Sequence, residues 1–261
     1  MIESVREVVE ILKYKEFLRN LVLRDIKVRY KRSVLGFIWV MLNPMLMMLI
    51  LNMVFSGLFT ASKKNYTSYL LAGIILWNFV SQSTSTSRTS FLGNRSLINK
   101  IYMPKAIFPL SVVISATINF IFSLVPLFII LYLNGTSISH NIFLLPLLII
   151  LVALFSFGIA LILSTLTVFF HDAIYIYEVV LLAWMYVTPI FYPESIVPQK
   201  FIFILHMNPL YYFVNIFRGS LSMEVSFLSE KLLYAFLFSL ASLSLGWLFY
   251  DRYKDRIPYY L

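Results

Sequence analysis

The side chains with the clearest capacity for binding chemistry are aromatic, and they gather between residues 184 and 219. This stretch holds Trp184, Tyr186, Phe191, Tyr192, Tyr211, Tyr212, Phe213 and Phe217, while Trp39 and Trp77 lie earlier, towards the ends of apolar segments. An aromatic face covers the C–H face of a sugar ring and leaves the sugar hydroxyls hydrated. Single Trp and Tyr residues more often serve as membrane anchors. The density of the cluster nevertheless favours ligand binding, with a sugar as a suitable ligand.

Four prolines divide the same region: Pro189, Pro193, Pro198 and Pro209. Each removes a backbone N–H and resists a helix interior. Residues 188–219 are therefore a poor membrane span, and we expect short helices that lie on the membrane or enter it and return. Irregular backbone is tolerated at membrane depth only against protein or a water-lined cavity.

The residues needed for catalysis are missing. None of the eight glycines is followed by lysine, so the loop that cradles nucleotide phosphates is absent, and no G-x-S-x-G motif occurs. The chain has no cysteine, and its three histidines lie far apart, which argues against a metal site. We expect that the chain is not an enzyme by itself and holds no metal.

Glu178 is the one carboxylate that falls well inside a predicted span. An acid at this depth is typical of ion-coupled transporters. The alternative is a carboxylate near the interface that pairs with a cytoplasmic cation such as Arg88, and we favour this pairing.

Composition identifies an integral membrane protein. The 261 residues are 60% hydrophobic and 13% charged, whereas soluble domains are about 45–50% apolar and about 25% charged. A net charge of +9 is compatible with nucleic-acid binding. In a membrane protein it is better explained by Lys and Arg in cytoplasmic loops.

The apolar segments predict an all-α protein with six transmembrane helices. A span needs about 20 mostly apolar residues, and the candidates are residues 34–59, 69–85, 106–133, 142–170, 173–187 and 232–250. The second ends in the hydroxyl-rich run SQSTSTSRTS, which either leaves the bilayer early or faces water in a pore. We divide the chain into an N-terminal region, residues 1–33, and a six-span domain, residues 34–261. Residues 188–230 form a separate segment between the last two spans.

The N-terminal region predicts an interfacial helix. Between Glu3 and Leu21 the apolar residues Val5, Val8, Val9, Leu12, Phe17, Leu18 and Leu21 fall on one helical face, the pattern of a helix lying in the membrane surface. A small helix that only anchors the terminus is an equal alternative. A cationic run with Arg24, Lys27 and Arg29 follows, interrupted by Asp25.

The positive charges predict the orientation. With six spans and a cytoplasmic N-terminus, sixteen of the 21 lysines and arginines fall in residues 1–33, residues 88–105 and the C-terminal tail. Such an asymmetry marks the cytoplasmic side. Both termini are therefore expected in the cytoplasm, and residues 188–230 on the extracytoplasmic side.

Three stretches resemble the permease subunits of polysaccharide-exporting ABC transporters: residues 21–50, 163–193 and 208–219. The first contains Arg24-Asp25, Ser33-Val34-Leu35-Gly36, Trp39 and Pro44, and the third reads NPLYYFVNIFRG. Their order and spacing match the family, and with the six spans they cover nearly the whole chain. One departure is His171-Asp172, where the family commonly has arginine before aspartate, so an ion pair is not implied there.

The resemblance implies a homodimer whose subunits line one channel, driven by two copies of a separate ATPase subunit that holds ATP and Mg. It implies a coupling helix in residues 88–105, with Asn94, Arg95, Ile98, Tyr102, Met103, Pro104 and Lys105 as candidate contacts. The N-terminal helix would lie beside it, with Arg24, Asp25 and Arg29 at this interface. The ten aromatic residues named above would belong to the channel and its outer gate.

The implied function is export of a lipid-linked polysaccharide, such as O-antigen, teichoic acid or capsule, across the bacterial plasma membrane. The implied partners are the ATPase, the glycan and membrane lipids, without nucleic acid. Two alternatives remain open: an ABC permease for a drug, lipid or other small amphiphile, and a membrane enzyme acting on lipid-linked sugars.

Overall fold

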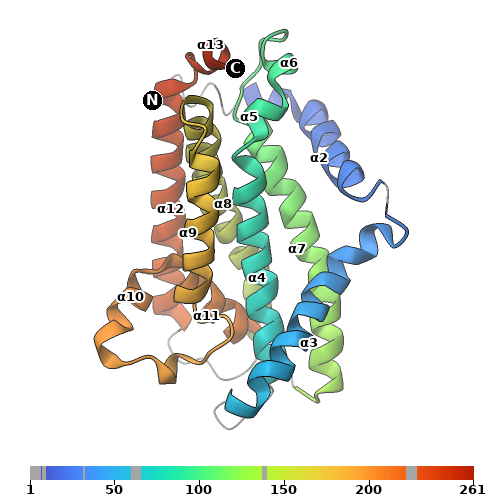
Figure 1. Cartoon of the computed structure of the whole chain (residues 1–261), viewed down its shortest axis with the longest axis vertical. Coiled ribbons are helices and arrows are strands. Elements are labelled where there is room, and N and C mark those ends of the chain that lie inside the picture. Colours follow the sequence, from blue (N-terminus) through green and yellow to red (C-terminus); the bar gives the residue numbers. More distant parts are fainter. Residues whose placement is uncertain (1–6, 8–9, 32, 60–65, 137–139, 222–227) are drawn as a thin grey trace.

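The computed structural model describes residues 7, 10–31, 33–59, 66–136, 140–221 and 228–261. All regular structure in these residues is helical, without a strand. The predicted all-α architecture is therefore confirmed. Long helices run roughly side by side along the longest axis of the molecule, and α3 crosses the others obliquely (Figure 1).

The long helices correspond closely to the predicted apolar segments. They are α3 (Trp39–Phe59), α4 (Tyr66–Ser87), α7 (Ile107–Leu133), α8 (Leu145–Phe169), α9 (Ala173–Val187) and α12 (Leu228–Tyr253), preceded by α2 (Lys15–Tyr30). The shorter elements are η1 (Gly36–Ile38), α5 (Ser90–Gly93), α6 (Arg95–Ile98), η2 (His140–Leu144), η3 (Glu194–Ile196), η4 (Gln199–Phe201), α10 (Ile202–Met207), α11 (Pro209–Leu221) and α13 (Ile257–Tyr260).

Four described helical segments are long and apolar enough to cross a membrane: Gly36–Phe55, Ile107–Leu133, His140–Phe169 and Leu228–Tyr253. The other two predicted spans correspond to α4 and α9. Helix α4 has 22 residues but a hydroxyl-rich end, and α9 is apolar but has only 15 residues. The number of spans, six, remains a prediction.

Helices α8 and α12 pack with their backbones in close contact. A Cβ added to Gly158 of α8 would overlap the backbone and hydroxyl of Ser242, and one added to Gly246 of α12 would overlap the backbone of Gly158. Ser239 and Ser242 donate hydrogen bonds across this contact to the carbonyls of Leu151 and Phe155, at 2.9 and 2.8 Å. Small residues that let two helix backbones touch, with hydroxyls bonding across, are typical of helix pairing in membranes.

Helix α4 is largely enclosed by its neighbours. Its apolar residues Leu70, Leu71, Ile75 and Val80 are almost inaccessible and pack in a core with α7, α8 and α11. The helix continues through the hydroxyl-rich run, where Ser83 and Thr84 donate to the Val80 carbonyl at 3.0 and 2.7 Å. Hydroxyls that bond back to the preceding turn need no water. Ser83, Thr84 and Ser87 accordingly lie buried against neighbouring helices.

The N-terminal region differs in part from its prediction. Helix α2 begins at Lys15 and reaches Tyr30, so it extends beyond the predicted helix and includes most of the cationic run. Leu21 is buried, but Leu12, assigned to the same apolar face, is exposed. The two lie nine residues apart, and the residue before α2, Tyr14, has φ −91° and ψ 23°, outside the helical range. A break at this point explains why one continuous face does not form. Val5, Val8 and Val9 lie outside the described residues.

The two ends of the bundle carry different segments (Figure 1). Helices α5, α6 and α13 lie together at one end, with α2 close by, whereas α10 and α11 lie at the opposite end. The predicted coupling loop and the predicted gate segment are therefore separated by the length of the long helices.

Candidate functional site

Helix α9 ends at Val187, where the proline-rich segment begins. Thr188 takes an extended conformation at the end of α9 (φ −85°, ψ 132°), as expected for a residue before proline. Pro193 and Pro198 are also extended, and each precedes a single short turn, η3 or η4. The prolines thus divide the segment into α10 and α11 joined by irregular chain. Part of the predicted segment, residues 222–227, lies outside the described residues.

Asn208 holds the junction between α9, α10 and α11. Its side-chain oxygen accepts hydrogen bonds from the Leu210 N–H at 3.0 Å and from Trp184 Nε1 at 2.8 Å. Its amide nitrogen donates to Thr188 Oγ1 at 2.9 Å. Because the next residue is Pro209, Asn208 is extended and its side chain is free to cap the first turn of α11. One amide therefore joins the end of α9 to the start of α11.

Arg218, in the last part of α11, is the central cation of the segment. It is only 8% exposed. Its guanidinium donates to the backbone carbonyls of Pro189 at 2.8 Å, Ile190 at 2.7 Å and Tyr69 at 3.1 Å. Its Cζ lies 3.3 Å from the centre of the Tyr69 ring, a cation–π geometry. Pro189 and Ile190 follow the end of α9, where no helix supplies donors for their carbonyls, so Arg218 supplies them.

This arrangement depends on Gly73 of α4. A Cβ at this position would lie 2.7 Å from Arg218 Nη2 and 2.9 Å from the Ile190 carbonyl oxygen. Only glycine lets the guanidinium and the irregular backbone approach the helix this closely.

Two tyrosines of α4 bond to the next part of the irregular chain. The Tyr66 hydroxyl donates to the Phe191 carbonyl at 2.6 Å, and the Tyr69 hydroxyl donates to the Tyr192 carbonyl at 2.9 Å. Together with Arg218 they bond four consecutive carbonyls, from Pro189 to Tyr192. The first turns of α4 therefore fix the segment that follows α9.

The ten predicted aromatic residues divide into two groups. Trp77, Tyr211, Tyr212, Phe213 and Phe217 are buried within the protomer, whereas Trp39, Trp184, Tyr186, Phe191 and Tyr192 are partly or fully exposed. Phe213 packs on Phe155 and Phe217 on Phe120, with ring centres 5.3 and 5.6 Å apart. The buried group therefore holds α11 against the bundle.

At the opposite end, the predicted coupling loop folds into α5, α6 and an extended strap. Ile98, Met103 and Pro104 are buried, whereas Tyr102 is 92% exposed and Arg95 is also exposed. Ile98 and Met103 belong to a second core with Phe91, Phe108 and Ile257. They anchor the loop, and Tyr102 and Arg95 are among the side chains that project from it.

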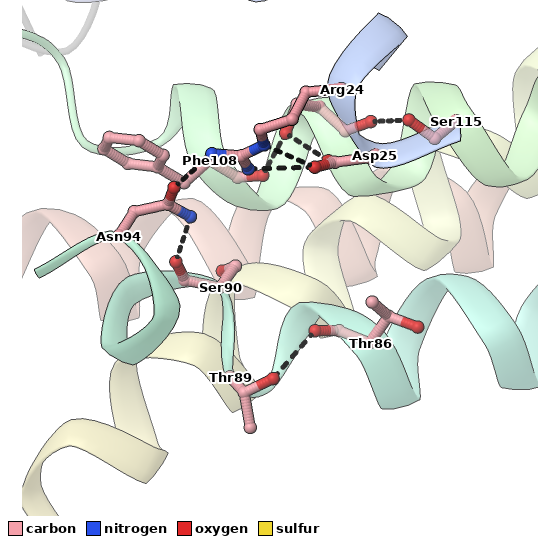
Figure 2. Close-up of polar contacts among 9 residues, drawn as sticks. Arg24, Asp25, Thr86, Thr89, Ser90, Asn94, Phe108 and Ser115 are labelled. Carbon is pink, nitrogen blue, oxygen red and sulfur yellow. Dashed lines mark hydrogen bonds and ion pairs between the residues drawn. The ribbon is translucent and has the colours of Figure 1, made fainter. Parts of the chain in front are cut away.

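Helix α2 lies directly beside this loop, as predicted (Figure 2). Arg24 donates to Asn94 Oδ1 at 2.8 Å and pairs with Asp25 at 2.8 Å, and Asn94 donates to the Ser90 carbonyl at 2.7 Å. Ser111 of α7 donates to Asp25 Oδ2 at 3.3 Å. Arg24, Asp25 and Asn94 thus come together at the junction of α2, α5 and α7. Arg29 lies apart from them, near the end of α2.

The C-terminal region joins the same end of the molecule. The Tyr250 hydroxyl donates to Glu7 at 2.5 Å and accepts from the Ala106 N–H at 3.1 Å. Lys254 donates to Glu7 at 3.0 Å and to Asp251 at 2.7 Å. Burial alone would lower the pKa of Lys254, but these two carboxylates raise its pKa above the ordinary value. Lys254 is therefore a stable cation that holds the N-terminal and C-terminal regions together beside the loop.

Near this end, Arg88 and Glu178 form the predicted pair. Arg88 Nη2 lies 2.6 Å from Glu178 Oε1, and Nη1 donates to the Ile174 carbonyl at 2.6 Å. The predicted pairing of Arg88 with Glu178 is confirmed, and its position at the membrane interface stays a prediction. Arg88, the residue after α4, therefore holds the first turns of α9.

Sequence reasoning missed several of these residues. Arg218 is one of the five lysines and arginines outside the predicted cytoplasmic regions, and its position after an aromatic run near several prolines is a signal for a special role. Gly73, Asn208 and Tyr69 carried no signal by type or spacing. Among the described residues no group of three His, Asp or Glu side chains lies close enough to hold a metal ion.

A bundle of long apolar helices with a loop docked at one end and a broken-helix segment at the other defines a polytopic membrane protein of the transporter kind. Residues 16–222 match the family model for ABC-2 type transporters. The O-antigen export system permease protein RfbA of Klebsiella pneumoniae is 33% identical over 188 residues, which cover 72% of this chain and 73% of that protein. The protein of the same name from Myxococcus xanthus is 30% identical over 209 residues, covering 79% and 80%.

The chain belongs to the ABC-2 type transporter family of membrane proteins. The resemblance predicted from the three sequence stretches is confirmed, and so is the membrane localisation. As a family member, the chain is the transmembrane subunit of a transporter.

Replacement of Gly73 by alanine is expected to destabilise the broken-helix segment. The new methyl group displaces either the Arg218 guanidinium or the Ile190 carbonyl, and each buried group left without a partner costs roughly 1–3 kcal/mol. A loss of about 2 kcal/mol lowers the midpoint of thermal unfolding by roughly 4–8 °C in a chain of this size. The measurement is thermal unfolding of the purified protein in detergent.

Gly93→Ala is the matched control, because nothing lies within 4 Å of the methyl group that it adds. Equal midpoints for wild type, Gly73→Ala and Gly93→Ala would contradict the close approach described here.

Proposed function

We propose that this chain is the channel-forming subunit of an ATP-driven exporter that moves a lipid-linked polysaccharide from the cytoplasm across the bacterial plasma membrane. The observation that carries the proposal is the similarity to O-antigen export permeases over about three quarters of the chain. Family membership supports transport, and the names of the relatives support a glycan as the substrate.

The proposed membrane arrangement has six spans, with both termini in the cytoplasm. Helix α4 has 22 residues, about 33 Å, and suffices to cross the hydrocarbon core, which is about 30 Å thick. Helix α9 has only 15 residues, about 22 Å. If α9 starts at the cytoplasmic interface, its end at Thr188 lies within the membrane, and the following segment must complete the crossing and turn back.

The hydrogen bonds of this segment support a re-entrant position. A lipid-exposed carbonyl without a donor costs several kcal/mol in the membrane. The carbonyls from Pro189 to Tyr192 all receive donors from Arg218, Tyr66 or Tyr69. A segment on the wet surface would not need a buried guanidinium for this purpose. We propose that α10 and α11 are the outer gate helices.

The end of the molecule that carries α5, α6 and α13 is the proposed binding site of the ATPase subunit. The chain lacks a phosphate-binding loop, so ATP and Mg would bind to a separate subunit. Tyr102 and Arg95 project from a loop that is braced by α2 and by the C-terminal region. We propose that they dock into that subunit, with two ATPase copies on a homodimer of this chain.

We propose that the exposed aromatic residues contact the glycan. Tyr186 is 58% exposed near the end of α9 and packs edge-on against Phe191, with ring centres 5.7 Å apart. The Tyr192 hydroxyl donates to the Tyr186 carbonyl at 2.8 Å and completes this small cluster. A sugar ring can lie on these faces, whereas Tyr212 and Phe213 support them from inside the protomer.

An ABC permease for a drug or another small amphiphile is the main alternative, and it predicts transport without a glycan. An enzyme acting on lipid-linked sugars is the alternative from a different class. It predicts turnover by the purified chain without ATP.

The test is reconstitution of this chain with its proposed ATPase subunit, in inverted vesicles that contain a radiolabelled lipid-linked glycan. We expect ATP-dependent transfer of the label into the vesicle lumen. Changing Tyr102 and Arg95 together to alanine should reduce copurification of the ATPase and transfer by about tenfold, since a single interface anchor contributes roughly 1–2 kcal/mol.

Tyr132→Ala is the control for this pair, because Tyr132 is an exposed tyrosine at the far end of α7. Normal assembly of the double variant would contradict the docking role. Transfer of the label without ATP or without the ATPase would contradict the exporter itself.

For the gate, Tyr186→Ala is expected to slow glycan transfer roughly fivefold, because stacking on one aromatic face contributes about 1 kcal/mol, with assembly and ATPase copurification unchanged. Tyr175→Ala is the control, since Tyr175 is equally exposed at the other end of α9. Equal transfer rates for the two variants would contradict the assignment of Tyr186 to the glycan path.

A further inference from the structure

A polar cleft of about 360 Å³ lies between α3, α4 and α7, away from both sites described above. The described residues that line it are Arg29, Trp39, Val40, Asn43, Pro44, Ile75, Asn78, Phe79, Ser81, Gln82, Ala116, Asn119, Phe120 and Ser123. Its apolar side includes Ile75, Phe79 and Phe120, which belong to the main core. Most of the lining belongs to helices that the proposed arrangement places in the membrane.

The polar residues of the cleft lie on one face of α4 and on one face of the neighbouring helix α7. Asn78, Ser81 and Gln82 have the i, i+3, i+4 spacing of one face of α4, and Asn119 and Ser123 have the i, i+4 spacing of one face of α7. Amide side chains are costly in hydrocarbon when they lack hydrogen-bond partners. Several amides lining one cleft therefore indicate a polar occupant.

Asn119 provides direct evidence for unfilled bonding capacity. It is 6% exposed, and its nitrogen donates to Gln82 Oε1 at 3.2 Å. Its oxygen has no hydrogen-bond partner among the described residues. Ser123, one turn further along, donates to the carbonyls of Val40 and Asn119 at 3.2 and 2.9 Å. A buried amide oxygen is an acceptor, and a hydroxyl group is its natural donor.

The charged and aromatic residues of the cleft indicate which other groups its ligand carries. Arg29 is the charged member of the described lining residues, and no carboxylate is among them. A guanidinium binds phosphate oxygens in a bidentate manner. Trp39 adds an accessible aromatic face, which suits a sugar ring. Amides, one guanidinium and one indole together fit a ligand that carries hydroxyls next to a phosphate.

We propose that this cleft binds the phosphate-linked first sugar of the lipid carrier, with the phosphate at Arg29 and sugar hydroxyls on Asn119 and Gln82. This inference rests on the proposed function and deepens it, because it gives the lipid-linked end of the substrate a binding site within one protomer. The apolar wall next to Pro44 and Phe120 then accompanies the start of the lipid chain.

The experiment measures equilibrium binding of tritiated polyprenyl diphosphate N-acetylglucosamine to the complex of this chain with its ATPase in lipid nanodiscs. Asn119→Leu and Gln82→Leu should each weaken binding about tenfold, the loss expected for one or two buried hydrogen bonds. The same two variants should leave binding of sugar-free polyprenyl diphosphate within about twofold. Arg29→Gln should weaken binding of both probes about tenfold, since a charge-assisted bond is lost.

Thr117→Leu is the matched control, because Thr117 lies on α7 outside the cleft and bonds to its own helix at Val113. Gln82 is only partly buried, so its variant tests the proposal even if Asn119→Leu fails to fold. Wild-type affinity for the sugar-bearing probe in Gln82→Leu and Arg29→Gln overturns the proposal. Loss of the dimer with unchanged probe affinity also overturns it, since the cleft would then contact a second protomer.

Glycan export is measured on the same preparations. If the Gln82→Leu and Arg29→Gln variants lose probe binding but export glycan at the wild-type rate, the proposed role of the cleft is wrong and the proposed function still stands. Lack of export by the wild-type complex overturns the proposed function.

Discussion

A helix that stops short leaves backbone carbonyls without donors, and the end of the bundle that carries α10 and α11 is organised around that constraint. Arg218 donates to the carbonyls of Pro189 and Ile190, and the Tyr66 and Tyr69 hydroxyls donate to the next two. A buried guanidinium is costly to desolvate and is retained where its donors are fully used. Gly73 provides the space for it. Without these contacts the chain after α9 would have no defined path against α4.

The same helices connect this segment to the other end of the molecule. The first turns of α4 hold the broken segment, while Arg88, just beyond its last turn, holds the start of α9 through Ile174 and Glu178. At its far end α9 is tied to α11 through Asn208. Loop 88–105 therefore begins at the end of α4 and contacts α9 through Arg88, and both helices also contact the proposed gate segment. In the proposed exporter, a displacement of this loop by an ATPase would reach the gate through α4 and α9, which are contiguous packed elements.

Sequence patterns predicted the features that depend on composition and local spacing. The apolar segments, the helical class, the contact of α2 with the loop and the Arg88–Glu178 pair followed from charge, hydropathy and motif resemblance. The role of Arg218 was not predicted, because its acceptors are backbone carbonyls, one of them 149 residues away. Every residue has a backbone carbonyl, so residue types do not indicate which carbonyls accept these bonds. The burial of Tyr211 and Tyr212 was missed for a related reason. Aromatic density does not tell which face packs inward, and α11 turns these rings towards the bundle.

Labelling of single cysteines tests most directly the central claim that the two ends of the bundle lie on opposite sides of the membrane. The chain has no native cysteine, so Lys200→Cys, within η4, and Lys100→Cys, just after α6, report without background. Both positions are exposed. A membrane-impermeant maleimide is applied to spheroplasts that contain the assembled complex. We predict labelling of Lys200→Cys in intact spheroplasts and of Lys100→Cys only after permeabilisation. Labelling of both positions from the same side would contradict the account.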